Sequence, residues 1–217
     1  MVVNEIFHSI QGEGTLAGTP SVFIRLAGCP VGCVWCDTKY AWNATEGEEL
    51  PIPEIVNRII RWPCRFIVIT GGEPIVNPQL PELTTALKER NKHITIETAG
   101  IKFIAGLSCD LMSVSPKLSN SGQENFSAHL PSIKQLIRRY PYQLKFVVDS
   151  ADDLPEIKKA VEQIGAVPAE KVMLMPQAKT REELIAKLPL VAQMCKETGY
   201  SFCQRLHILL YDGVRGK

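Results

Sequence analysis

The feature that most constrains the fold of this 217-residue chain is an alternation of short apolar runs with segments of helical spacing. The runs are rich in β-branched residues and are predicted to be strands. They are Ser21–Leu26, Phe66–Thr70, Ile94–Thr98, Leu111–Ser115, Leu144–Val148, Val172–Met175 and Phe202–His207. Strands that are mostly apolar and are joined by helices are typical of a parallel sheet covered by those helices.

Apolar residues that recur at helical spacing predict the covering helices. Their faces are formed by Ile55, Ile59 and Trp62; Leu80, Leu83 and Leu87; Ile133, Leu136 and Ile137; Leu154, Ile157, Val161 and Ile164; and Leu184, Leu188 and Val191. Thr180 and Glu183 have the spacing of a capping box at the start of the last helix. We therefore expect one α/β domain of residues 1–217, built as an open parallel sheet or a partial (incomplete) βα barrel with outer helices.

Polar segments rich in Gly and Pro follow three of the predicted strands. They are Gly71-Gly72-Glu73-Pro74, Ser115-Pro116-Lys117 and Met175-Pro176-Gln177. Because sheets of this kind bind ligands at the carboxyl ends of their strands, the segments predict a site at that edge. Two stretches depart from the alternation: the cysteine-rich loop of residues 28–40, and Ser119–Ala128, which we expect to be an irregular, mobile loop beside the site.

The charge balance argues against some classes of partner. Lys and Arg number 24 against 23 Asp and Glu, so the net charge of +1 gives no electrostatic reason to expect binding to nucleic acid or an anionic membrane. The first residues, Met1–Glu5, lack the basic region and apolar core of a signal peptide. No apolar run approaches the ~20 residues that cross a bilayer. We expect a cytoplasmic protein.

Cysteine spacing is the strongest chemical signal. Three of the seven cysteines, Cys29, Cys33 and Cys36, lie within eight residues. In a reducing cytosol such clustering indicates metal binding rather than disulfides. The other four stand alone and are expected to be small buried hydrophobic residues: Cys64, Cys109, Cys195 and Cys203.

Three thiolates on a short loop suit a [4Fe–4S] cluster with one iron left free of protein ligands. The amino and carboxylate groups of S-adenosylmethionine (SAM) can chelate such an iron, and one electron then cleaves a carbon–sulfur bond to give a 5′-deoxyadenosyl radical. The alternative is a structural zinc site, which needs four nitrogen or sulfur ligands. Its fourth ligand would have to come from a distant residue such as Cys64 or His8.

The cysteine triplet, followed 35 residues after Cys36 by Gly71-Gly72-Glu73-Pro74, resembles the radical SAM superfamily. More of the chain resembles the 7-carboxy-7-deazaguanine synthases within it. The matching segments are Asn4-Glu5-Ile6-Phe7-His8-Ser9-Ile10-Gln11-Gly12-Glu13-Gly14, Phe23-Ile24-Arg25-Leu26-Ala27-Gly28-Cys29, Trp35-Cys36-Asp37-Thr38, Ile96-Glu97-Thr98, Ser115-Pro116-Lys117 and Leu206-His207-Ile208-Leu209-Leu210.

This resemblance implies a partial βα barrel of the radical SAM type. It also implies a reaction that contracts the ring of 6-carboxy-5,6,7,8-tetrahydropterin to 7-carboxy-7-deazaguanine, with loss of ammonia. The implied cofactors are the [4Fe–4S] cluster, SAM and Mg²⁺. The implied partners are the small-molecule pterin, a flavodoxin or ferredoxin as electron donor, and a second copy in a homodimer.

The resemblance also implies which residues contact the pterin: Ile10, Gln11, Gly12, Glu13, Arg25, Thr70, Glu97 and His207. The residue types suit this substrate, because Gln11 and Glu13 can match the donors and acceptors along a pterin ring edge. Arg25 can hold the substrate carboxylate with a bidentate fork. On the residues alone, the segment from Gln11 can equally be an ordinary turn, and Arg25 can be half of a structural ion pair.

For SAM, the resemblance implies contacts from Trp35, Cys36, Asp37, Gly72, Glu73, Ser115, Lys117 and Gln177. For Mg²⁺ it implies the hydroxyl of Thr38, which is acceptable as a lone protein ligand because Mg²⁺ keeps several waters and takes other ligands from its substrate. We expect no catalytic side chain beyond the cluster and SAM, since the cofactor performs the difficult step while the protein orients the substrate and excludes water.

Two other functions remain open on the sequence. One is an activating enzyme for a glycyl-radical protein, which would share the cysteine triplet and the Gly-Gly-Glu-Pro segment. The other is a non-catalytic iron–sulfur or zinc binding module. The sequence also leaves open whether residues 213–217 close over the substrate or form a frayed tail.

Overall fold

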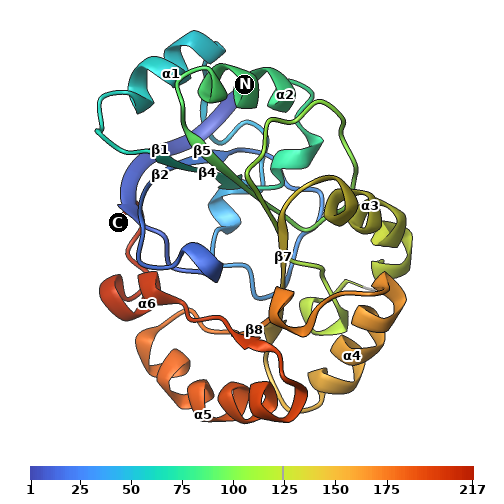
Figure 1. Ribbon diagram of the computed structural model, residues 1–217. Coiled ribbons are helices and arrows are strands. Elements are labelled where there is room, and N and C mark those ends of the chain that lie inside the picture. The colour runs from blue at the N-terminus through green and yellow to red at the C-terminus, as the bar shows by residue number, and fades with distance from the viewer. Residues whose placement is uncertain (124) are drawn as a thin grey trace.

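The computed structural model describes residues 1–123 and 125–217 (Figure 1). Its strands are β1 (Val2–Ile10), β2 (Pro20–Leu26), β3 (Glu48–Glu49), β4 (Phe66–Gly71), β5 (His93–Thr98), β6 (Leu111–Val114), β7 (Tyr142–Val148), β8 (Val172–Pro176) and β9 (Ser201–Phe202). They form one sheet in the order β3-β1-β2-β4-β5-β6-β7-β8-β9. Every pairing from β2 to β9 is parallel, whereas β1 runs antiparallel to both of its neighbours.

The α-helices are α1 (Ile52–Ile59), α2 (Leu80–Lys88), α3 (Phe126–Arg139), α4 (Asp153–Ile164), α5 (Arg181–Thr198) and α6 (Leu206–Tyr211). The sheet curls strongly, and α1 to α5 lie around its outer side (Figure 1). Because β3 and β9 end the strand order without pairing to each other, the barrel is incomplete. The expected partial βα barrel with a parallel sheet and outer helices is confirmed. None of the described helices is both long and apolar enough to span a membrane.

The alternation of side chains along each strand divides the sheet into an outer and an inner face. Ile24, Ile69 and Ile96 point outward, are fully buried and belong to one large apolar core with the helix residues Ile55 and Leu83. The residues next to them in sequence point inward instead. This inner face carries a row of polar side chains from five successive strands: Arg25, Thr70, Glu97, Ser113 and Lys145.

Several sequence expectations are corrected by the structure. The predicted strand Phe202–His207 ends at Phe202, and its last two residues begin α6. The Leu206 amide donates to the Gly12 carbonyl oxygen at 2.9 Å, which ties the start of α6 to the segment after β1. The sequence also failed to indicate β1, whose apolar residues are interrupted by polar ones.

The segment Ser119–Ala128 is more regular than expected. It begins with a 3-10 turn at Ser119–Ser121, and α3 starts at Phe126, so the last residues of the segment are helical. Position 124 of this segment lies outside the described residues. The predicted capping box of α5 is confirmed, since the Glu183 amide donates to Thr180 Oγ1 at 3.2 Å and the Glu183 side chain accepts from the Thr180 amide.

Candidate active site

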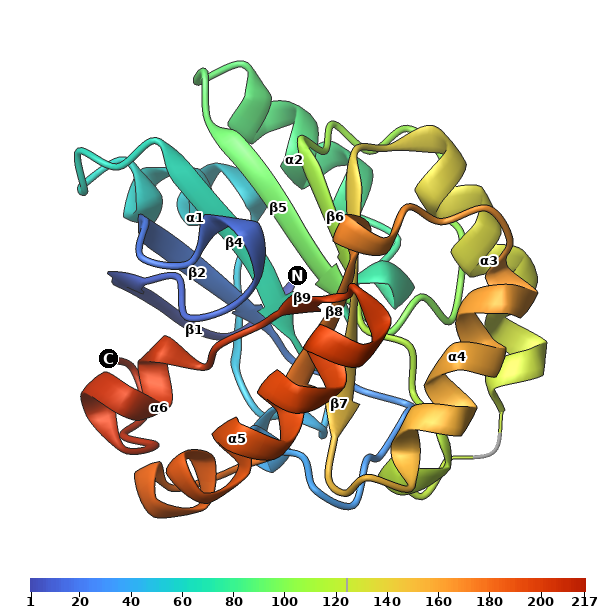
Figure 2. The same cartoon turned by 60° about the horizontal axis from the view of Figure 1, so that its bottom comes forward.

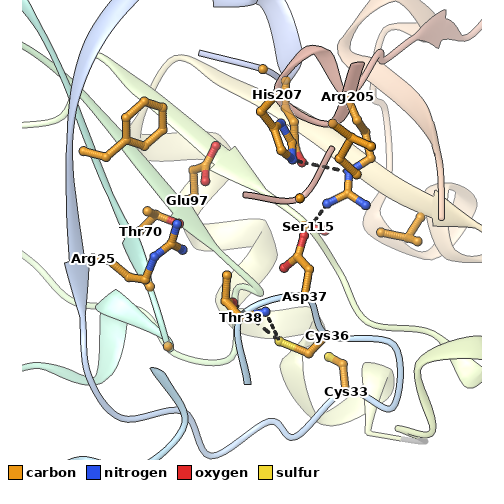
Figure 3. A pocket seen from close by; sticks show the side chains of 18 of the residues that line it. Arg25, Cys33, Cys36, Asp37, Thr38, Thr70, Glu97, Ser115, Arg205 and His207 are labelled. Carbon is orange, nitrogen blue, oxygen red and sulfur yellow. Dashed lines mark hydrogen bonds and ion pairs between the residues drawn. The ribbon is translucent and has the colours of Figure 1, made fainter. Parts of the chain in front are cut away.

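A cavity of about 300 Å³ lies within the curl of the sheet, at the carboxyl ends of the parallel strands. All the site residues predicted from the sequence line this one cavity. Figure 3 shows Cys33 and Cys36 on one side of it and Glu97 and His207 on the other, with Asp37 and Thr38 between the two groups. The cavity therefore joins the cysteine loop to the inner polar face of the sheet.

The cysteine loop is held by backbone and indole donors. Gly28, whose φ of 96° suits glycine, donates to the Ala41 carbonyl, and the Cys29 amide donates to the Trp42 carbonyl oxygen at 3.0 Å. The Trp42 indole Nε1 donates to Cys36 Sγ at 3.3 Å, and the Thr38 amide donates to the same sulfur at 3.4 Å. These two N–H groups hold the Cys36 side chain in place within the loop.

The cysteine loop presents three thiols to the cavity. Cys29, Cys33 and Cys36 are all free of disulfides and all line the cavity. A [4Fe–4S] cluster held by three cysteines keeps one iron free of protein ligands. The loop therefore supplies the three ligands that such a cluster needs.

The segment after β4 packs directly on the cysteine loop. A Cβ at Gly72 would lie 2.0 Å from the Gly28 carbonyl oxygen, so only glycine allows this approach. The buried carboxylate of Glu73 accepts hydrogen bonds from the Ala99 amide at 2.7 Å and from Thr98 Oγ1 at 2.6 Å. Burial raises the pKa of Glu73 despite these donors. Glu73 thus ties the ends of β4 and β5 together beneath the loop.

The far wall of the cavity is a network of buried charges. Lys145 Nζ lies 2.7 Å from Glu13 Oε2 and 3.4 Å from Glu97 Oε1, and Gln11 Nε2 donates to the same Glu97 oxygen at 3.2 Å. Arg205 connects Glu13 to Asp37, as Figure 3 shows for its bond to Asp37.

Burial alone would raise the pKa of Glu13, but the nearby cations Lys145 and Arg205 outweigh it and hold that pKa well below its usual range. Glu13 is therefore a buried carboxylate anion. The pKa of His207 is lowered, chiefly by burial, which leaves a neutral imidazole beside it.

The two ends of the chain meet at this wall. Figures 1 and 2 both place α6 beside the segment that follows β1. A Cβ at Gly12 would lie 2.1 Å from His207 Nδ1, so a glycine is required where the two segments touch. The predicted pterin residues Gly12 and His207 are thus in direct contact.

Arg25 makes the ion pair that the sequence left open. Its Nε donates to Glu5 Oε1 at 2.6 Å, and its guanidinium lies over the rings of Phe7 and Tyr40 at 5.7 and 5.8 Å. The pair with Glu5 uses only Nε. Within the described residues no hydrogen bond is formed by the two Nη groups of Arg25, which lies in the cavity wall. An ion pair with Glu5 and a contact with a ligand are therefore compatible.

The remaining predicted residues lie nearer the cysteine loop. Lys117 Nζ donates to Ser115 Oγ at 2.9 Å and lies 5.3 Å from the ring centre of Trp35. The indole Nε1 of Trp35 is buried, and within the described residues it has no hydrogen-bond partner. Gln177 accepts a hydrogen bond from Lys187 at 2.9 Å. Ile10 and Thr70 also line the cavity.

Relatives of known identity decide the family. Residues 23–144 match the Radical SAM superfamily. The chain is 39% identical, over 100% of its length and 88% of the relative, to a 7-carboxy-7-deazaguanine synthase of Rhodopirellula baltica. It is 38% identical, over 99% of its length and 96% of the relative, to the synthase of the same name from Pyrobaculum aerophilum. This chain belongs to the 7-carboxy-7-deazaguanine synthases of the radical SAM superfamily.

A solved structure supports this assignment. QueE from Escherichia coli superposes with a TM-score of 0.72 at 28% identity, and the match covers 95% of this chain and 94% of that one. Membership of the radical SAM superfamily implies a [4Fe–4S] cluster and SAM as cofactors, and the cysteine loop described above fits them. Neither the glycyl-radical activating enzyme nor the non-catalytic metal module is favoured by these matches.

Sequence reasoning missed several residues of this synthase-family site. They are Tyr40, Trp42, Lys145, Arg205 and Arg215. A signal existed for Lys145, because it is the one charge within the apolar run Leu144–Val148. No local pattern marked the others. Arg215 joins the site only through tertiary contacts, with its guanidinium 4.0 Å from the Tyr40 ring centre and its Nε 3.0 Å from Glu5 Oε2.

Proposed function

We propose that this protein converts 6-carboxy-5,6,7,8-tetrahydropterin to 7-carboxy-7-deazaguanine by a radical ring contraction with loss of ammonia. The single observation that carries the proposal is the position of Gln11, Glu13 and Glu97 in the same cavity as the cysteine loop. A flat ring with several N–H donors placed against these side chains would lie next to the cluster. The proposal treats residues 1–217 as one radical SAM domain.

Cys29, Cys33 and Cys36 would hold the [4Fe–4S] cluster, which together with bound SAM supplies a 5′-deoxyadenosyl radical able to abstract a hydrogen atom. Around SAM, the protein would supply packing and hydrogen bonds. The buried Nε1 of Trp35 has no hydrogen-bond partner within the described residues, so it could donate to SAM. Because Gly72 has no side chain, its own backbone lies close to the cysteine loop. The other contacts proposed for SAM are Asp37, Glu73, Ser115, Lys117 and Gln177.

The charged wall supports pterin binding. Glu97 Oε2 is engaged in no hydrogen bond within the described residues, so this oxygen is available to a ring N–H. The Nη groups of Arg25 and the neutral imidazole of His207 are donors that suit the substrate carboxylate. Ile10 and Thr70 would complete the ring contacts, and Gly12 would do so through its backbone.

We also propose Mg²⁺ as a further cofactor, with Thr38 as its protein ligand. Thr38 Oγ1 lies 3.5 Å from Cys36 Sγ, a weak contact that leaves the hydroxyl oxygen free to bind a hard cation. The proposal includes a homodimer in the cytoplasm, with a flavodoxin or ferredoxin that delivers the electron. The small net charge of +1 fits this setting.

The deciding experiment is anaerobic turnover. The protein is reconstituted with iron and sulfide, mixed with dithionite, SAM, Mg²⁺ and 6-carboxytetrahydropterin, and analysed by chromatography with mass detection. Substrate-dependent 5′-deoxyadenosine together with the deazaguanine carboxylate supports the proposal. Deoxyadenosine without that product would keep the radical chemistry and overturn the substrate. Neither product, despite about four irons per chain, would overturn the enzymatic function itself.

A further inference from the structure

Lys145 is a buried charge whose position is not explained by the needs of the fold. It lies in the middle of β7, only 3% exposed, and points to the inner face of the sheet. Its outward-pointing neighbours Leu144 and Phe146 supply the core packing of this strand. Removal of a lysine ammonium from water is costly, and a buried ion pair is often no more stable than apolar residues of similar volume. Its presence therefore indicates a role in the cavity.

The ammonium group joins two carboxylates from different parts of the chain. Glu13 follows β1 and Glu97 belongs to β5, so neither strand could set the distance between them by itself. Lys145 Nζ contacts one oxygen of each, Oε2 of Glu13 and Oε1 of Glu97. Gln11 also donates to Oε1 of Glu97, so both donors bind the same oxygen and leave Oε2 without a hydrogen-bond partner among the described residues.

We propose that Lys145 is a positioning residue for substrate recognition, which holds Glu13 and Glu97 as a fixed pair of anions that accept the N–H groups of the aminopyrimidinone edge of a pterin. This inference rests on the proposed function and adds to it a residue that acts through the two carboxylates. A fixed pair needs no rearrangement when substrate binds. A free pair of anions would repel each other, and one of them would take up a proton.

The effect of pH follows from the groups that face Glu13. They are Lys145 from β7, Glu97 from β5, Asp37 from the cysteine loop, Cys203 after β9, and Arg205 and His207 at α6. Burial raises the pKa of Glu13. Among the groups that lower this pKa, Lys145 has the largest effect. Loss of Lys145 therefore raises the pKa of Glu13. The protonated carboxyl loses an acceptor, so substrate binding weakens at the acid end of the pH range.

The test is Lys145→Met in the reconstituted holoenzyme, which removes the charge and keeps the length of the side chain. We expect the iron content to match the wild type, because Lys145 is not part of the cysteine loop. The KM for the tetrahydropterin should rise about tenfold or more, as for loss of a charged hydrogen bond, with a smaller change in kcat. The acid limb of the pH profile of kcat/KM, where activity falls as the pH falls, should lie at a higher pH in the variant than in the wild type.

Two further variants complete the design. Lys88→Met removes a lysine that pairs with Asp110 outside the cavity, and it should change neither KM nor the pH profile. Lys145→Gln retains a donor without the charge, so it should move the acid limb as Lys145→Met does but raise KM less. If Lys145→Met fails to load iron, KM and the pH profile are measured on Lys145→Gln instead.

The outcomes separate the two proposals. A wild-type KM and an unmoved acid limb in both Lys145 variants would overturn the positioning role, while the wild type still converts the pterin. If the wild type itself forms no deazaguanine, the proposed function fails instead.

Discussion

Arg205→Leu tests whether the charged wall is as tightly coupled as its geometry indicates. Arg205 is 7% exposed and contacts three partners: Glu13 Oε1 at 3.3 Å, the carboxylate of Asp37, and the Ala178 carbonyl oxygen. Leucine fills much of the same space but leaves Glu13 with Lys145 as its only close ion-pair partner of fixed charge among the described residues. Loss of one partner from a buried ion network costs about 3–5 kcal/mol.

We therefore expect Arg205→Leu to lower the free energy of unfolding at neutral pH by about 3–5 kcal/mol. For a chain of this size, this corresponds to a melting temperature lower by about 10 °C. Urea and thermal unfolding, followed by circular dichroism on wild type and variant at equal iron content, measure both quantities. Arg58→Leu is the matched control, because Arg58 makes ion pairs with Glu48 and Glu54 that are exposed to solvent, and its loss should have a much smaller effect.

The difference in the free energy of unfolding between wild type and Arg205→Leu should depend on pH in a defined direction. The folded-state pKa of Glu13 is depressed below its ordinary value of 4.5, so this carboxylate contributes stability above that pH and the contribution is lost as the pH falls further. We expect the difference in stability to be full at pH 7 and to narrow below about pH 4.5. The reasoning would be refuted if Arg205→Leu lowered the free energy of unfolding by less than about 1 kcal/mol at pH 7. It would also be refuted if the difference in this free energy between wild type and variant grew as the pH fell.

Three more expectations concern the cavity. Gly12→Ala places a methyl group 2.1 Å from His207 Nδ1, so pterin turnover should fall about tenfold or more while SAM cleavage without substrate persists; unchanged turnover would show that the two segments separate readily. Arg25→Ala should raise the KM for the pterin with cluster content intact, measured by iron analysis and kinetics, whereas loss of iron would mean that the pair with Glu5 is structural. Removal of Mg²⁺ with a chelator should slow turnover and readdition should restore it, while Thr38→Ala should blunt that response; turnover indifferent to Mg²⁺ would exclude this cation from the site.

The outer face of the sheet could be predicted well from the sequence. Runs such as Phe66–Thr70 and Ile94–Thr98 appear as strands because their outward residues must pack against helices. The strand-end segments led to the cavity because ligands of parallel sheets bind where such strands end. The roles of individual residues came from the family resemblance rather than from local patterns.

What the sequence did not reveal depends on contacts between distant segments. The six residues of α6 are too few to show helical periodicity, and their apolar content looks like that of a strand. β1 escaped detection because Asn4, Glu5 and His8 interrupt its apolar residues. Arg205 and Arg215 join the site through ion pairs with Glu13 and Glu5, which lie near the opposite end of the chain and could not be paired with them from the sequence.

The hydrogen bond from Arg205 to Glu13 spans 192 positions of sequence, and it bears on the order in which the protein assembles. Contacts between distant segments form late, because a long loop must first be closed. On the ribosome, the cysteine loop and most of the sheet would be synthesised well before α6 emerges. We expect the substrate wall to be the last part to form and the first to open under mild denaturant, so activity should disappear before helix content does.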